Sequence, residues 1–228
     1  MRKEHIVTTI AFLLAAGLFV PAAASQVREL AWADLVKKVE FEDPFEALAP
    51  DQLLDLSLVV RAREQEASGR EVGEEARKRW EAATMRLEKA GVDIDGLLAK
   101  KEEIAELRRQ RAYAVVESLN GQQVRMPGYV LPLEYHGTQI AEFLLVPWVG
   151  ACIHTPPPPP NQIVYVKMEK AVEIRGGFMP VGGFIPVWVT GEMTVKAATK
   201  NLYLVDGSAD IDVGYSLQAS QVEPYKTH

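Results

Sequence analysis

The residues best suited to chemistry stand close together, with Cys152 two positions before His154. In an extended chain, side chains two positions apart point to the same side, so this thiol and imidazole can face one ligand. Together they can bind zinc or copper. A thiolate beside an imidazolium is instead a nucleophile or a redox centre. Because a buried cysteine also packs as a small hydrophobic side chain, the pair alone leaves binding, reaction and packing open.

A metal site needs three or four ligands, so a third donor must come from elsewhere in the chain. His136 precedes the strand that leads to Cys152, and we predict it as a third ligand. Glu134 and Glu142 are alternative donors. Cys152 is the only cysteine, so no disulfide can form within the chain.

The loop that holds this pair contains five consecutive prolines at 156–160. Such a run forms a polyproline II rod, which is stiff and has no internal hydrogen bonds. We expect the rod to brace the loop, and Trp148 to add an aromatic contact surface. A recognition loop for another molecule is therefore an alternative to a metal site.

Motifs of the common enzyme classes are absent from the sequence, which has no nucleophile elbow, phosphate-binding glycine loop or Cys-x-x-Cys pair. This favours a binding role over catalysis, with a thiol-dependent enzyme or redox protein using Cys152 as the alternative. A purely structural interaction module, whose helices dock on another protein, is a third possibility. The net charge of −6 disfavours a nucleic-acid partner, whose phosphates select clustered positive charge.

Residues 1–24 have the three parts of a secretory signal peptide. Arg2 and Lys3 supply positive charge, an apolar run covers 6–20, and three alanines end at Ala24. We therefore expect cleavage near Ala24 and a periplasmic protein. The run is short for a membrane span of about 20 residues, so an uncleaved anchor is the less favoured alternative. No later segment is apolar enough to be a span.

Residues 25–119 are predicted to be helical. A first helix starts at Pro50-Asp51, with Asp51 as its N-cap, and ends at Ser68-Gly69. A second has apolar residues at helical spacing and ends at Gly91. These residues are Val72, Ala76, Trp80, Ala83 and Leu87. A third is predicted from Asp93 or Asp95 to Leu119. Its alternating charges between 100 and 111 indicate a solvated face, with packing on a partner as the alternative.

Residues 120–228 are predicted to form a β domain, because short β-rich runs alternate with glycine and proline. The runs are 122–133, 140–146, 163–168, 184–195, 203–215 and a last piece near Val222. Pro127-Gly128 predicts a bulge or sharp coil in the first run, and Gly191 lies inside the fourth. Short strands with internal glycines suit a closed barrel. We therefore predict an α+β protein with an OB-like antiparallel β-barrel, and a sandwich as the alternative.

Four motifs in this part resemble an uncharacterised family of exported bacterial proteins, known as a domain of unknown function. They are 124–133, 142–147, 150–162 and 186–191, the third reading Gly-Ala-Cys-Ile-His-Thr, five prolines, Asn and Gln. The resemblance covers 119–225 well and the helical part loosely. It implies a periplasmic protein often encoded near ABC-transporter permeases, and hence a transporter component or other envelope protein as partner. It also implies that Cys152, His154, Asn161 and Gln162 form one unit, without choosing among metal, thiol and docking roles.

Overall fold

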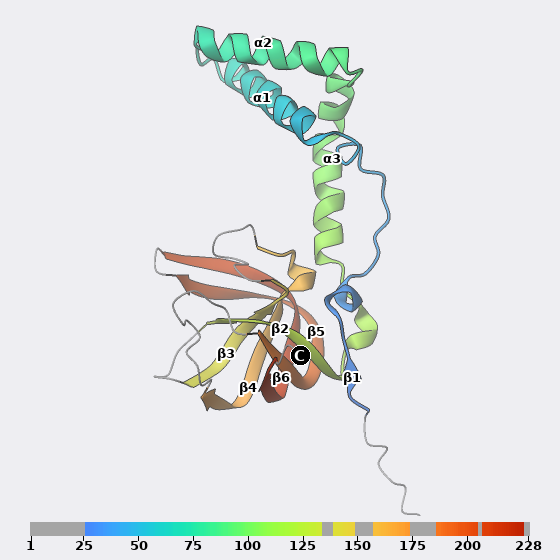
Figure 1. Cartoon of the computed structure of the whole chain (residues 1–228), viewed down its shortest axis with the longest axis vertical. Coiled ribbons are helices and arrows are strands. Elements are labelled where there is room, and N and C mark those ends of the chain that lie inside the picture. Colours follow the sequence, from blue (N-terminus) through green and yellow to red (C-terminus); the bar gives the residue numbers. More distant parts are fainter. Residues whose placement is uncertain (1–25, 134–138, 149–156, 174–185, 205–206, 226–228) are drawn as a thin grey trace, which may run out of the picture.

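Three helices precede a β-barrel in the computed structural model, which describes residues 26–133, 139–148, 157–173, 186–204 and 207–225 (Figure 1). The helices are α1 (Pro50–Ala67), α2 (Glu74–Lys89) and α3 (Ile94–Tyr113). The strands are β1 (Arg28–Glu29), β2 (Gln123–Pro132), β3 (Gln139–Val146), β4 (Val164–Glu173), β5 (Pro186–Leu204) and β6 (Gly207–Pro224). Short 3-10 turns are η1 (Trp32–Leu35), η2 (Glu117–Leu119) and η3 (Pro160–Gln162). The predicted α+β class is confirmed. Among the described residues, no helix combines the length and apolar character needed to cross a bilayer.

Helices α1 and α2 form a hairpin that projects away from the barrel, and α3 connects the hairpin to the barrel (Figure 1). Val59 of α1 packs with Ala83 and Leu87 of α2 in a small buried cluster. Helix α3 buries Ile94 and Leu97 beside that cluster but only Ile104 in the rest of its length. A helix that is polar on nearly all sides is expected where it bridges two parts of a protein through solvent.

The sequence prediction is confirmed for the N-cap of α3 and is wrong for the N-cap of α1 and for the C-terminal end of α3. Asp93 caps α3 as predicted, because its carboxylate accepts a hydrogen bond from the Gly96 backbone nitrogen at 2.9 Å. Asp51 is not the N-cap of α1: Ala49 occupies that position and Pro50 is the first helical residue, where its fixed φ suits the helix. Helix α3 ends at Tyr113, six residues before the predicted end at Leu119, because the backbone turns extended at the next residue.

An irregular strap, residues 36–49, runs beside α3 (Figure 1). Arg108 of α3 donates two hydrogen bonds to the carboxylate of Asp43, at 2.6 and 3.0 Å, and the Asp43 side chain is only 1% exposed. This guanidinium holds the pKa of Asp43 below its ordinary value. Arg111 lies over the ring of Phe41, 4.8 Å from its centre. These two arginines therefore bind the strap, although their side chains are still 47% and 42% exposed, so the predicted solvent exposure holds for them and the contact with the strap is additional.

The barrel closes in the order β2-β3-β4-β6-β5 and back to β2. Numbered within the barrel, this is the order 1-2-3-5-4-1 of an OB-like fold, as predicted. The pairs are antiparallel except β4 with β6, which run parallel from Val164↔Tyr215 to Met168↔Ala219. The barrel is therefore mixed and not wholly antiparallel. Five strands in a closed ring cannot alternate in direction all the way round, so one parallel pair is unavoidable.

The strand boundaries correct two further expectations. The runs predicted at 184–195, 203–215 and near Val222 are two long strands, β5 and β6, which pair along nearly their whole length. Strand β2 passes through Pro127 and Gly128 without the predicted bulge. Proline is tolerated there because β1 has already ended and β3 has not yet begun, so β2 has a strand on one side only. The irregular pairings lie elsewhere, between Thr190 and Gly191 among other places.

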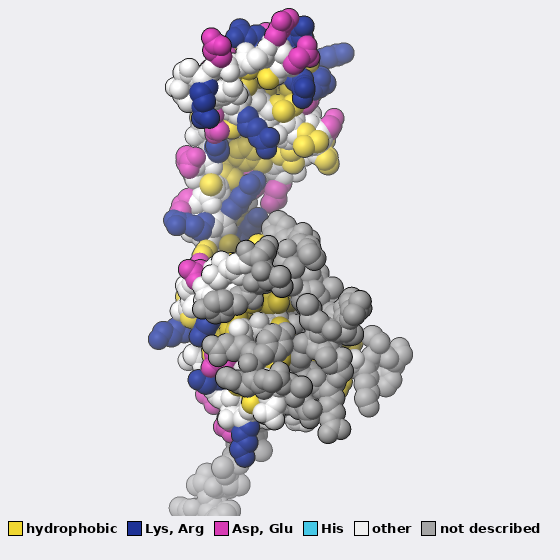
Figure 2. Space-filling model, turned by 90° about the vertical axis from the view of Figure 1, so that its left-hand side faces the viewer, with side chains coloured by type: hydrophobic (Ala, Val, Ile, Leu, Met, Phe, Trp, Pro, Cys, Tyr) yellow, Lys and Arg dark blue, Asp and Glu magenta, His cyan; other side chains and the backbone are white. Residues whose placement is uncertain are grey.

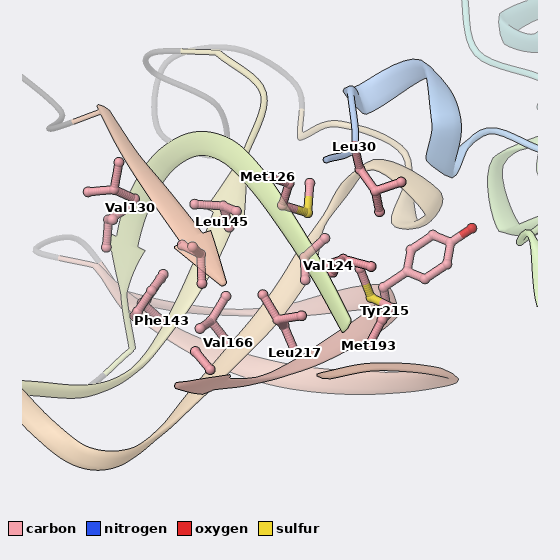
Figure 3. Close-up of a cluster of buried hydrophobic side chains, with 14 of the residues drawn as sticks. Leu30, Val124, Met126, Val130, Phe143, Leu145, Val166, Met193, Tyr215 and Leu217 are labelled. Carbon is pink, nitrogen blue, oxygen red and sulfur yellow. The ribbon is translucent and has the colours of Figure 1, made fainter. Parts of the chain in front are cut away.

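The barrel interior is a single apolar cluster, to which β2 contributes alternate residues such as Val124 and Met126. Figure 3 shows Met126, Leu145 and Leu217 pointing toward one another from different strands. Tyr215 closes one end of this core, where its hydroxyl donates to the Leu35 carbonyl at 2.6 Å and accepts from a backbone N–H beyond α3 at 2.7 Å. This one side chain thus joins the barrel to the segments on both sides of the helices.

A second core lies outside the barrel. It packs Leu144 and Tyr165, from β3 and β4, against Leu202 and Val213, from the long ends of β5 and β6. The extension of β5 and β6 beyond the barrel therefore covers the outer face of β3 and β4. These are the two strands that the polyproline loop, residues 147–162, connects.

Candidate binding site at the polyproline loop

The polyproline loop, residues 147–162, connects β3 to β4 and ends with η3. The predicted ligands Cys152 and His154 lie outside the described residues, as does His136. Trp148 is the last described residue before residues 149–156, and it is 41% exposed. Within the described ranges, no three His, Cys, Asp or Glu side chains are grouped so that they could hold a metal ion.

Strand β3 lies between the predicted third ligand and the polyproline loop. Residue 136 precedes the first residue of β3, whereas the loop begins after the last one. Eight residues of strand place these two ends about 23 Å apart, at 3.3 Å per residue. Of the two alternative donors, Glu134 also lies outside the described residues, and Glu142 forms an ion pair with Lys167 at 3.4 Å. The neighbourhood of the loop's far end, at η3, therefore matters more for finding further ligands.

Asn161 fixes that far end. The residue is 2% exposed, and its amide nitrogen donates to the carbonyl oxygens of Arg111 at 2.9 Å and Ala114 at 3.0 Å. These carbonyls belong to the C-terminal end of α3, where backbone oxygens have no partner within the helix. Asn161 therefore acts as a cap from a distant part of the chain, and it ties the polyproline loop to α3.

The backbone around Asn161 is packed as closely as its side chain. Gln162, a predicted binding residue that is half-buried, donates its backbone N–H to Pro159 at 2.7 Å. Strand β6 passes beneath at Gly214, where an added Cβ would lie 3.1 Å from the Pro160 oxygen and 2.9 Å from a valine methyl. Only glycine lets η3 approach β6 this closely. The far end of the loop is thus held by β6 and α3 together.

A hollow of about 310 Å³ lies beside the prolines. Pro157 to Pro160 form one side, and Tyr113, Asp210 and Asp212 contribute to its lining. Asp212 accepts hydrogen bonds from the Tyr113 hydroxyl at 2.5 Å and from Thr199 at 2.8 Å, which hold its pKa below the ordinary value. The same bond raises the pKa of Tyr113. The hollow therefore pairs an apolar proline wall with fixed negative charge.

A second pocket, of about 250 Å³, lies at the near end of the loop beside Pro147. Its lining is aromatic and proline-rich, consisting of Trp32, Pro127, Gly128, Tyr129, Pro147, Pro186 and Tyr225. An added Cβ on Gly128 would lie 2.9 Å from the Trp32 ring and 2.6 Å from Leu145, so glycine is what lets Trp32 lie on β2. The pocket is suited to an apolar or aromatic group.

An aromatic stack borders this pocket. The rings of Trp188 and Tyr225 are 5.5 Å apart at 24°, and the Arg125 guanidinium lies 4.2 Å from the Trp188 ring centre. Arg125 also approaches Glu29 and Glu223, at 3.5 and 3.4 Å. The alternation along β2 could have predicted only that Arg125 points outward, because Trp188 belongs to β5 and Tyr225 follows β6. The partners of Asn161 lie 47 and 50 residues away, and no sequence signal marks them.

Comparisons with known proteins place the chain beside one family. The family model described as "Protein of unknown function (DUF3299)" matches residues 32–224. A crystal structure of a DUF3299 family protein from Pseudomonas aeruginosa PAO1 is 30% identical, with 89% of this chain and 99% of that chain covered and a TM-score of 0.47. A search of curated proteins gave no match.

Proposed function

The chain belongs to the DUF3299 family, and we propose that it is an exported, periplasmic binding protein that holds a transition metal, zinc or copper, at the polyproline loop. In this proposal residues 1–24 are removed on export, and the barrel presents the loop. Cys152 is the soft ligand and His154 is the second ligand.

The anchored end of the loop is the observation that carries the proposal. Asn161, buried and bonded to two carbonyls of α3, holds η3 in one place. Metal ligands must be held in a fixed geometry, and a rigid support reduces the entropy lost on binding. Three chain steps from Pro157 to His154 span at most about 11 Å, so the anchor also limits how far the imidazole can be from the hollow.

In this proposal a carboxylate at the hollow, rather than His136, is the third ligand, because the hollow adjoins the described prolines of the loop. Asp210 and Asp212 are two positions apart on β6 and both line the hollow beside the prolines. Both oxygens of Asp212 already accept hydrogen bonds, whereas Asp210 accepts one from a described residue, the amide of Asn201 at 2.8 Å. Asp210 is therefore the third ligand in our proposal.

Metal analysis of the full-length protein, purified without an affinity tag from the periplasm, tests this assignment. We expect about one zinc or copper per chain, at least tenfold weaker binding in Cys152→Ala and His154→Ala, and weaker binding in Asp210→Asn. His136→Ala is the matched control and retains the metal. Unchanged metal content in both Cys152→Ala and His154→Ala, or metal-free wild-type protein that binds neither ion on titration, would contradict the proposal.

The alkylation rate of Cys152 separates the metal site from thiol chemistry. A metal-bound thiolate reacts slowly until a chelator removes the metal. A thiol enzyme or redox protein instead has a thiol pKa well below about 8.5 and reacts rapidly in the metal-free state at neutral pH. An ABC-transporter component as the partner remains part of the proposal, and site-specific crosslinking from Trp148 in envelope preparations tests it.

A further inference from the structure

The hairpin of α1 and α2 carries a groove of its own, far from the polyproline loop. The groove has a volume of about 130 Å³ and lies between the second half of α1 and the first half of α2, toward the end of the hairpin away from α3 (Figure 1). We name it the hairpin groove. Its lining includes Leu58, Arg61, Val72, Ala76, Arg79 and Trp80.

Apolar side chains extend from the groove along the surface of α1. Leu54 is 68% exposed and lies one helical turn before Leu58, which is 37% exposed and lines the groove. Figure 2 shows apolar side chains gathered among charged ones on this upper part of the molecule. The indole nitrogen of Trp80, whose residue lines the groove, is buried and has no hydrogen-bond partner among the described residues, which is an unfavourable state for a donor. Leu54 and Leu58 therefore extend the apolar lining of the groove along the exposed surface of α1.

Each wall of the groove carries one arginine. Arg61 on α1 and Arg79 on α2 both line it, and neither forms an ion pair with a described residue. Two other arginines of the hairpin form ion pairs with a different helix: Arg63 pairs with Asp95 at 2.5 Å, and Arg86 pairs with Asp55 at 2.6 Å. The groove therefore offers an apolar floor between two guanidinium groups that are free to bind carboxylates.

We propose that the hairpin groove docks an acidic amphipathic helix of another protein. One apolar side chain of that helix fills the groove, whose volume is close to that of a cavity of about 150 Å³ that holds a benzene molecule. Carboxylates on both sides of this anchor pair with Arg61 and Arg79, since guanidinium and carboxylate form strong, directional hydrogen bonds. This inference does not depend on a metal site at the polyproline loop.

Two designed peptides test the proposal on the full mature chain. Both are fluorescein-labelled amphipathic helices of about 18 residues with the same leucine face. Glutamates flank the leucines in one peptide, and lysines flank them in the other. Anisotropy titrations at low and high salt should show saturable binding of the glutamate peptide, weakened by salt because Debye screening shortens the range of exposed charges. The lysine peptide should bind at least tenfold more weakly.

Charge reversal at the groove should invert this preference. The double variant Arg61→Glu/Arg79→Glu should lose at least tenfold in affinity for the glutamate peptide and gain affinity for the lysine peptide. Arg77→Glu, an exposed arginine of α2 outside the groove, is the matched control and should change affinity less than twofold. All of these substitutions are at exposed positions, and circular dichroism checks that helix content is unchanged.

Any of four results would overturn the proposal. The glutamate peptide could show no saturable binding below about 0.5 mM, corresponding to a binding free energy of only about −4.5 kcal/mol. The two peptides could bind alike, or Arg77→Glu could weaken binding as much as the double variant does. Sedimentation could also show a wild-type dimer that the double variant dissociates, and then the occupant is a second copy of this chain.

Discussion

Replacing Asn161 with alanine tests how the polyproline loop is held. The wild-type amide donates two hydrogen bonds, at 2.9 and 3.0 Å, from a residue that is 2% exposed. Each such bond contributes about 1 kcal/mol net, and its loss leaves a carbonyl at the end of α3 without a partner. We therefore expect Asn161→Ala to lower the free energy of unfolding by about 2–3 kcal/mol. For a chain of this size that corresponds to a fall in Tm of about 5–10 °C.

Thermal and urea unfolding, followed by far-ultraviolet circular dichroism, measure the effect. Asn201→Ala is the matched control, because exposed Asn201 makes one hydrogen bond, to Asp210 at 2.8 Å. Its loss should cost less than about 0.5 kcal/mol. If Asn161→Ala costs no more than Asn201→Ala, Asn161 is not the anchor and the support for a rigid loop is lost.

The variant Asn161→Asp adds a pH dependence whose sign follows from the same geometry. A carboxylate at this position would face two carbonyl oxygens, so burial and repulsion raise its pKa in the folded protein above the unfolded value of about 3.9. The protonated acid can still donate one hydrogen bond. The variant should therefore be closest to wild type near pH 4 and lose stability as the pH rises through the raised folded pKa. An equal loss at pH 4 and pH 8 would contradict the placement of the amide nitrogen.

Two further substitutions test the strap and the aromatic pocket. Asp43→Asn should lower the free energy of unfolding by about 1–2 kcal/mol at pH 7, as expected for hydrogen bonds between charged groups that are partly solvated. Because Arg108 lowers the folded pKa of Asp43 below 3.8, the wild-type advantage should be complete above that value and disappear as the pH falls through the folded pKa in urea titrations. Gly128→Ala should cost about 1–3 kcal/mol by overpacking, since the new Cβ would lie 2.6 Å from Leu145, and an unchanged Tm would contradict this packing.

Periodicity was enough to predict the main elements. The apolar spacing of the second helix identifies the face that packs in the hairpin, where Ala83 and Leu87 are buried. The short β-rich runs with internal glycine predict the barrel, because burial alternates along β2 as two-residue periodicity requires. The extension of β5 and β6 was less visible, since its strands are half-exposed beyond the barrel and polar residues there resemble a loop.

Contacts between distant residues could not be predicted from the pattern. Arg108 meets Asp43 across 65 positions, and the helix sequence alone cannot distinguish that pairing from solvated charge. Asn161 likewise reads as a polar loop residue, although its side chain points inward to the end of α3. Both contacts join residues that are far apart in the sequence and adjacent in the fold.

The length of α3 makes the two proposals separable. Its 20 residues span about 30 Å, and the hairpin groove lies beyond one end while Asn161 binds the other. Substitutions at sites that are far apart are expected to act additively. Arg61→Glu/Arg79→Glu should therefore leave metal content unchanged, and Cys152→Ala should leave affinity for the glutamate peptide unchanged. Because Asn161 ties the loop to α3 itself, Asn161→Ala is the one substitution for which a change in both measurements would reveal coupling through the helix.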